Sequence, residues 1–206
     1  MKKNFQIWNL VGNTTNDKKI WGIETIDFPC AFLSHKGVLI KKKKFFTNKN
    51  FSSKSWILSG YAIEVKKANN KSLIKCYRPW VSIITNHLSE YLAKRNHTIE
   101  IWDKGVNIIY SLWQDNTQYL GKKLNNNDIK EKLNLILDDK IFNGLEFKDY
   151  KNKPNEIISF FSKFLTLNNG DIFTLGPLVI TELPKNIKKI KIKTKKINEN
   201  FLISKG

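Results

Sequence analysis

Three features of the sequence predict a mostly β fold with minor α content, of the α+β class. Most apolar segments are short and alternate with polar residues, as strands with one buried face do. Apolar residues recur clearly at helical spacing in one segment, 155–164. The tail alternates isoleucine with lysine, which is typical of a strand with one buried and one solvated face. No linker or repeat divides the chain, so we expect a single domain over 1–206.

In the N-terminal half we expect two strands, an interrupted apolar stretch and a helix. Residues 5–12 alternate apolar and polar side chains. The apolar stretch 30–40 is interrupted near its middle by polar residues and a glycine, so it would be broken in two. Segment 56–66 is rich in β-branched and aromatic residues, which favour strands. A short helix is expected at 86–95, with Asn86 as its cap.

In the C-terminal half the clearest element is a helix, because five apolar residues form one stripe at helical spacing. They are Ile157, Ile158, Phe161, Phe164 and Leu165. The expected elements are, in chain order, a strand at 106–113, a loop at 121–131, a strand through Leu133, Leu135 and Leu137, the helix at 155–164 capped by Asn155, a turn at 167–171, a short strand at 172–175 and a strand at 187–197.

The composition limits the classes of function. The net charge is +18, and a basic surface attracts nucleic acid or acidic membranes. Only Arg78 and Arg95 are arginines, however, and an AT-rich genome alone would enrich lysine and asparagine. Because arginine is the preferred residue for bidentate phosphate and base contacts, its scarcity argues against specific nucleic-acid recognition.

The sequence also bears on location and on cysteine chemistry. No apolar run approaches the roughly 20 residues that span a bilayer, and the N-terminus lacks the apolar region of a signal peptide. We therefore expect a cytoplasmic protein without a membrane partner. Cys30 and Cys76 lie in no metal-binding or redox motif, and we expect both to be buried as small apolar residues.

The C-terminal third resembles the end of the fumarylacetoacetate hydrolase family, whose motif is L-I-x-x-x-S-x-x-x-T-L-x-P-G-D-x-I-x-T-G-T-P. The matching segments are Ile157–Leu167, Gly170–Phe173 and Gly176–Pro177. Three further segments match family motifs in the same chain order. They are Val11–Asn13 (V-G-x-N-Y), Pro29–Ile40 (P-V-L-F-L-K-P-P-S-A-L-I) and Asp103–Asn107 (A-K-G-F-D). The resemblance implies a mixed β-roll or barrel and a dimer.

The resemblance also implies a metal site, which this sequence does not reproduce. Family members hold Mg²⁺ or Mn²⁺ through the glutamates of an E-x-E strand and through an aspartate. Leu58 and Gly60 stand at the glutamate positions here, and His87 stands at the aspartate position. Leucine and glycine side chains offer no oxygen, and imidazole is a poor Mg²⁺ ligand, so we expect no cofactor. Glu64 would lie roughly 13–20 Å along the strand from these positions, too far to replace them.

Four residues are candidates for a retained ligand site. Lys104 stands where the resemblance places the family's pocket lysine, beside Gly105, and would bind a small carboxylate. Gly176 belongs to the matching rim loop. His87 is a candidate for proton transfer. The alternatives are a solvated lysine at 104 and a merely hydrogen-bonded histidine at 87. The family's acid–base pair H-A-x-E has no counterpart; Asp17 alone lies in that region.

These residues favour a degenerate family member, a pseudoenzyme without metal-dependent C–C hydrolase or decarboxylase activity. It would bind a small carboxylate near Lys104 and form a homodimer or pair with an active paralogue. One alternative is an active hydrolase, decarboxylase or isomerase of this family acting on a keto acid such as an acylpyruvate. Another is a basic module that binds nucleic acid on the same scaffold, and salt-sensitive affinity would reveal it.

Overall fold

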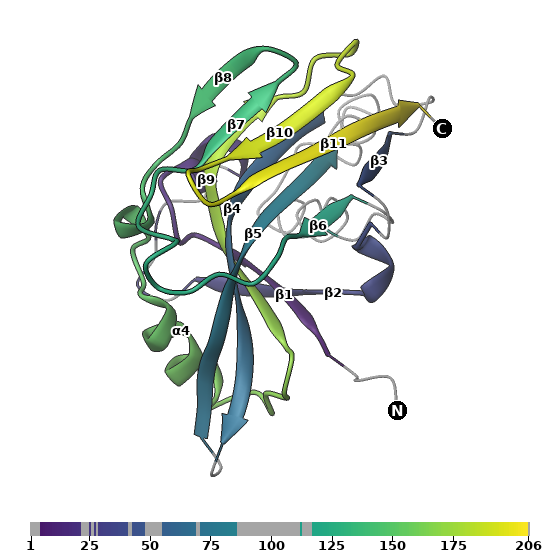
Figure 1. Ribbon diagram of the computed structural model, residues 1–206. Coiled ribbons are helices and arrows are strands. Elements are labelled where there is room, and N and C mark those ends of the chain that lie inside the picture. Colours follow the sequence, from purple (N-terminus) through teal and green to yellow (C-terminus); the bar gives the residue numbers. More distant parts are fainter. Residues whose placement is uncertain are drawn as a thin grey trace.

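The computed structural model describes residues 5–21, 25, 27, 29–40, 43–47, 55–68, 71–85, 112 and 117–205. Within them the chain forms a six-stranded and a five-stranded sheet, with few helices (Figure 1). Each sheet contains both parallel and antiparallel pairs. The predicted α+β class with mixed sheets is therefore confirmed.

The six-stranded sheet has the order β2-β1-β9-β4-β5-β6 among the described residues. Its strands are β1 (Ile7–Val11), β2 (Cys30–Ser34), β4 (Ser55–Ala68), β5 (Lys71–Thr85), β6 (Gln118–Leu120) and β9 (Ile172–Glu182). β1 runs parallel to β9, and the other neighbours are antiparallel. β4 and β5 form a long ribbon at the centre of the molecule (Figure 1).

The five-stranded sheet has the order β3-β11-β10-β7-β8 within the same described ranges. Its strands are β3 (Lys44–Thr47), β7 (Asn134–Leu137), β8 (Lys140–Asn143), β10 (Lys189–Lys193) and β11 (Asn198–Lys205). β3 is parallel to β11, and the other pairs are antiparallel.

The helices are short. They are α1 (Asn16–Trp21), α4 (Pro154–Phe161) and the 3-10 turns η1 (Lys36–Val38) and η2 (Phe147–Asp149). α4 lies alongside the β4–β5 ribbon (Figure 1). Among the described residues, no helix is long and apolar enough to cross a membrane.

Two hydrophobic clusters occupy the two faces of the six-stranded sheet, because neighbouring residues of β4 point to opposite faces. The larger cluster includes Tyr61 of β4, Ile190 of β10 and Ile157 of α4, and thus joins both sheets to the helix. The smaller one includes Leu58, Ala62, Trp80, Ile84 and Leu112.

Several predicted elements are confirmed. The strands expected at 5–12 and 56–66 correspond to β1 and β4, and the stretch 30–40 is divided into β2 and η1 as expected. The strand through Leu133, Leu135 and Leu137 is β7, with all three leucines buried. The expected helix at 86–95 lies outside the described residues, as does the strand at 106–113 apart from Leu112.

The helix at 155–164 exists, but its predicted ends are wrong. It begins at Pro154, with Lys153 rather than Asn155 as the cap, because proline is pre-organised for a first helical position. The Lys153 backbone N–H donates to Glu156 Oε2 at 2.8 Å. The helix ends at Phe161, so Phe164 is 71% exposed instead of extending the buried stripe.

Two predicted strands have different lengths. The strand expected at 172–175 continues as β9 to Glu182, because Gly176 adopts a positive φ of 94° that lets the chain bend and carry on. The strand expected at 187–197 is shorter, because β10 ends at Lys193 and residues 194–197 form the turn of a hairpin with β11. Its turn forms at Thr194, whose N–H donates to Ile197 O at 2.9 Å.

The cysteines are less buried than expected. Cys30 is exposed because β2 is the edge strand of its sheet, and Cys76 is half-buried beside a charged cluster. Neither forms a disulfide.

Candidate functional site at the junction of β4 and β9

Gly60 stands at one of the two positions that the resemblance aligns with metal-binding glutamates. β9 approaches β4 so closely here that a Cβ built on Gly60 would lie 2.5 Å from Gly176 O and 2.9 Å from Tyr150 Oη. The first of these contacts is with backbone, which cannot swing aside as a side chain can. This arrangement leaves no room for a glutamate side chain.

Leu58 occupies the second aligned position and is 1% exposed. It belongs to the apolar cluster that also contains Trp80, Ile84 and Leu112. A carboxylate in such surroundings would lose its hydration without gaining partners, which is costly. The described part of the predicted metal position therefore does not fit a hard cation. Within the described ranges, no three His, Cys, Asp or Glu side chains group closely enough to hold a metal ion.

Tyr150 fills the gap created by an irregular β4–β9 ladder. Gly60 pairs with Pro177 and Ala62 with Thr174, so two residues of β9 bulge between them. The Tyr150 hydroxyl donates to Gly176 O at 3.1 Å and accepts from the Tyr61 N–H at 3.0 Å. Burial raises the pKa of Tyr150 well above its usual value, so this hydroxyl stays a neutral bridge.

Residues that follow β1 form hydrogen bonds with β9 from the side opposite β4. The backbone of β1 pairs with β9 as far as Thr174, and beyond that point the side chains of Asn13 and Asn16 bond to β9 instead. Asn13 Nδ2 donates to Leu175 O at 2.9 Å, and Asn16 Nδ2 donates to Leu178 O at 2.9 Å. Neutral amides thus satisfy the carbonyls of β9 on both sides of its bend at Gly176.

Asp17 lies beneath this turn and is fully buried. Its Oδ2 accepts hydrogen bonds from the N–H groups of Asn13 at 3.1 Å and Thr14 at 2.9 Å. Its Oδ1 is buried and has no hydrogen-bond partner among the described residues. Burial raises the pKa of Asp17 to about 6, although the hydrogen bonds from Thr14 and the neighbouring backbone lower it. The carboxyl titrates near neutrality but is sealed from solvent, which supports a structural role.

Gly176 was predicted to line the ligand site, and the structure places it in this buried cluster. Its carbonyl accepts from Tyr150, and a Cβ at this position would lie 3.4 Å from Asp17 Oδ2. Lys104, Gly105 and His87 lie outside the described residues. Their convergence on Gly176 therefore stays a prediction.

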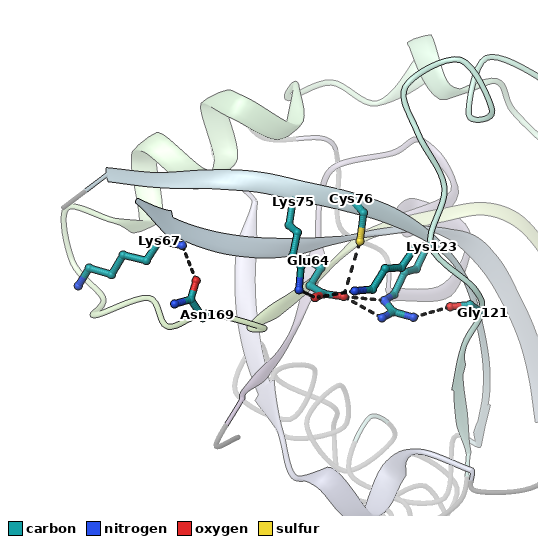
Figure 2. A network of polar contacts seen from close by, with 8 residues as sticks. Glu64, Lys67, Lys75, Cys76, Gly121, Lys123 and Asn169 are labelled. Carbon is teal, nitrogen blue, oxygen red and sulfur yellow. Dashed lines mark hydrogen bonds and ion pairs between the residues drawn. The ribbon is translucent and has the colours of Figure 1, made fainter. Parts of the chain in front are cut away.

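Glu64 is the centre of a charged cluster that sequence reasoning missed (Figure 2). Lys75 Nζ donates to its Oε1 at 2.6 Å, and Arg78 donates to its Oε2 through Nη2 at 2.8 Å and Nε at 3.0 Å. Lys123 Nζ lies 3.7 Å from Oε1. A bulge in β5 makes this convergence possible, because Glu64 pairs with Cys76 and Val65 with Ile74, leaving Lys75 as the extra residue.

The cluster fixes the ionisation of Glu64. Burial raises its pKa, but the hydrogen bonds and charges of Lys75 and Arg78 outweigh burial and lower it to about 2. All oxygens of the carboxylate face cations or Cys76 Sγ. Glu64 is therefore already engaged by cations.

A second buried carboxylate, Glu199, adjoins this cluster across Gly121. Tyr119 Oη donates to Glu199 Oε2 at 2.9 Å, and Lys43 forms an ion pair with the same oxygen. Arg78 Nη1 donates to Gly121 O at 2.7 Å, and a Cβ on Gly121 would lie 3.4 Å from Glu199 Oε1. The sequence signal was that Glu64 and Glu199 are each the only acidic residue of their strand.

Solved structures of the fumarylacetoacetate hydrolase family share this fold over nearly the whole chain. A family protein from Yersinia pestis superposes with a TM-score of 0.74 at 16% identity, covering 99% of this chain and 95% of that one. Fumarylpyruvate hydrolase from Pseudomonas aeruginosa, solved with Mn²⁺ and pyruvate, gives 0.69 at 10% identity, covering 100% and 93%. Maleylpyruvate hydrolase from Sphingobium gives 0.69 at 13% identity, covering 98% and 71%.

No protein-family model and no curated protein matches the chain. At identities this low, the likeness to solved structures establishes the fold and leaves the chemistry to the site. The resemblance first seen in the motifs is thus confirmed as a fumarylacetoacetate hydrolase fold.

Proposed function

We propose that this chain is a degenerate member of the fumarylacetoacetate hydrolase family that lacks metal-dependent C–C hydrolase or decarboxylase activity. The observation that carries the proposal is the contact at Gly60, where a Cβ would lie 2.5 Å from Gly176 O. The position aligned with a metal-binding glutamate is therefore occupied by the backbone of β9.

The donor set supports the same conclusion. A Mg²⁺ or Mn²⁺ ion needs several oxygen donors in near-octahedral geometry. Leu58 lies in an apolar cluster, Gly60 has no side chain, and His87 supplies nitrogen rather than oxygen. No reaction step through a metal ion is therefore assigned to these residues.

A retained ligand site forms the second part of the proposal. Lys104 and Gly105 bind a small carboxylate beside the bend at Gly176, and His87 supplies a hydrogen bond or a proton. The net charge of +18 favours an anionic ligand. The protein acts as a single-domain homodimer or pairs with an active paralogue, and a cytoplasmic location stays a prediction of the sequence.

Calorimetric titration with MgCl₂ and MnCl₂, with and without oxalate, tests the first part. Oxalate mimics the enolate of a keto acid and completes the coordination of a metal in a working site. We expect no metal binding in either condition. Micromolar Mn²⁺ binding that requires oxalate would refute degeneracy and favour the alternative, an active enzyme on a keto acid such as an acylpyruvate.

Titration with oxalate alone tests the second part. We expect weak binding to the wild-type chain that is lost in Lys104→Ala and kept in Lys66→Ala, a control that removes an exposed lysine of β4. Equal loss in both variants would show that net charge, and not a site at Lys104, attracts the anion. Sedimentation equilibrium would test the homodimer, which a monomer at all concentrations would exclude.

A further inference from the structure

The outer face of the five-stranded sheet has an unusual composition. The pairing register places the buried residues Leu135, Ile192 and Phe201 on the inner face, so alternate residues point outward. The outward positions that we call the outer face are Asn134 and Ile136 of β7, Ile141 and Asn143 of β8, Lys189, Lys191 and Lys193 of β10, Asn198, Asn200 and Leu202 of β11, and Lys44 of β3.

The lysine row of β10 has no acidic partner among the described residues. None of the described outward residues is acidic, and no described carboxylate forms an ion pair with Lys189, Lys191 or Lys193. Asp138, at the turn between β7 and β8, is occupied by the backbone N–H groups of Lys188 and Lys189, at 3.3 and 2.9 Å. Glu199 of β11 points inward, where it meets Lys43 and Tyr119.

The lysines are also held at regular intervals. Residues two apart on a strand lie roughly 7 Å from each other, and adjacent strands are about 4.8 Å apart. The backbone positions of Lys189, Lys191 and Lys193 therefore form a regular row along β10. On the β11 side Asn200 pairs with Lys191 and Asn198 with Lys193, and on the β7 side Asn134 pairs with Lys193. A regularly spaced row of cations with neighbouring amides suits a ligand that carries its own regularly spaced negative charges.

We propose that the outer face binds the phosphate backbone of nucleic acid without reading its sequence. Lysine and asparagine both contact phosphates, and such contacts position a protein without specifying bases. No arginine occupies the outward positions named above, so bidentate base recognition is not expected. This binding is independent of the degenerate pocket.

A protein partner fits the face less well. Protein interfaces have apolar cores from which lysine is depleted. Here the exposed aliphatic residues Ile141 and Leu202, 58% and 57% exposed, are separated by the lysine row of β10. A second copy of the same face is disfavoured as well, because its lysines would repel these lysines.

Fluorescence anisotropy with a fluorescein-labelled 20-nucleotide oligothymidylate and a 20-base-pair duplex tests the proposal. Binding to at least one probe should weaken steeply as NaCl rises from 50 to 250 mM, because phosphate contacts release counterions. The variant K189Q/K191Q/K193Q should bind about tenfold more weakly at 50 mM NaCl, with a salt slope shallower by about 2. The control K66Q/K153Q/K163Q removes the same charge from exposed lysines elsewhere and should lose less than about threefold.

Three outcomes would overturn the proposal. They are no binding of either probe at 50 mM NaCl, an equal loss in both triple variants, and displacement of the probe by a 20-residue polyglutamate as effectively as by unlabelled DNA, which would indicate an acidic protein partner. Circular dichroism and thermal unfolding verify that both variants fold. Should the β10 variant unfold, K191Q alone replaces it, with an expected loss of about threefold against less than 1.5-fold for K153Q.

Discussion

Asp17 and Glu64 are both carboxylates buried against the six-stranded sheet, yet their pKa values move in opposite directions. Burial raises the pKa of Asp17 to about 6, because its partners are neutral N–H and O–H groups. Burial acts on Glu64 too, but Lys75 and Arg78 more than reverse it, and the pKa falls to about 2. The neutral donors around Asp17 thus offset the effect of burial on its pKa only in part, whereas the cations around Glu64 more than offset it.

The difference sets opposite pH dependences. A lowered pKa in the folded state gives stability that is present above the ordinary value of 4.5 and lost as pH falls toward 2. The raised pKa of Asp17 destabilises the folded state by an amount that is absent below pH 3.8 and complete above about pH 6. The combined contribution of the two groups therefore favours the folded state most strongly at about pH 4–5, where Glu64 is largely ionised in the folded state and Asp17 is still largely protonated.

The largest effect is expected for Glu64→Gln. At about 1.4 kcal/mol per pH unit, the lowered pKa corresponds to roughly 3 kcal/mol of stability at neutral pH. The variant loses this stability and leaves Lys75 and Arg78 without a counter-charge. Urea unfolding at pH 7 and at pH 2.5 would measure it. An equal difference in unfolding free energy between wild type and variant at both pH values would contradict this prediction, since the loss would then not depend on the ionisation of Glu64.

Tyr150→Phe tests the neutral cluster. The variant leaves the Tyr61 N–H and the Gly176 carbonyl buried and unpaired, which we expect to cost about 2 kcal/mol. The loss should be independent of pH between 5 and 8, because the hydroxyl is neutral throughout. Urea unfolding across this range would check it, and Tyr77→Phe, at a tyrosine with no described hydroxyl hydrogen bond, serves as a matched control.

Asp17→Asn is expected to be stabilising at high pH. The amide keeps an oxygen that accepts from Asn13 and Thr14 and cannot ionise, so the penalty above pH 6 disappears. We expect a gain of roughly 1–2 kcal/mol at pH 8 and no gain at pH 4.5. Thermal unfolding from pH 4 to 8 would measure both. A variant that is weaker at pH 8 would show that the ionised carboxylate stabilises this turn after all.

Local sequence patterns predicted much of the fold. The alternation of β1, β4 and β7 and the apolar stripe of α4 lie within single segments, so each could be recognised alone. β5 was not predicted, because the bulge at Lys75 disturbs its alternation and Pro79 is atypical of a central strand. β6 and β8 contain three and four residues, too few for a period to show.

The candidate site depends on contacts between distant segments, which no local pattern encodes. The substitutions at Leu58 and Gly60 could be recognised from the motifs, but the collision with Gly176 O follows from the bulge in β9, where two residues face Tyr61 alone. Asn13 and Leu175 are 162 positions apart in the chain. The partners of Glu64 likewise required the register of β5, which the sequence had not predicted.

The smallest effect, and the sharpest test of the comparison, is expected for Lys123→Gln. Lys123 Nζ lies 3.7 Å from Glu64 Oε1 and its side chain is 53% exposed, whereas Lys75 donates to the same oxygen at 2.6 Å. Water screens the longer pair, so we expect a change within about 0.5 kcal/mol, and a larger loss for Lys75→Gln because its contact with Oε1 is shorter. Urea unfolding of both single variants and of the double variant at pH 7 would separate the two contributions.

Because Arg78 alone makes two hydrogen bonds to Glu64, the loss of stability on acidification below pH 4.5 should persist in the double variant. Its disappearance would mean that the lysines, rather than Arg78, keep Glu64 ionised.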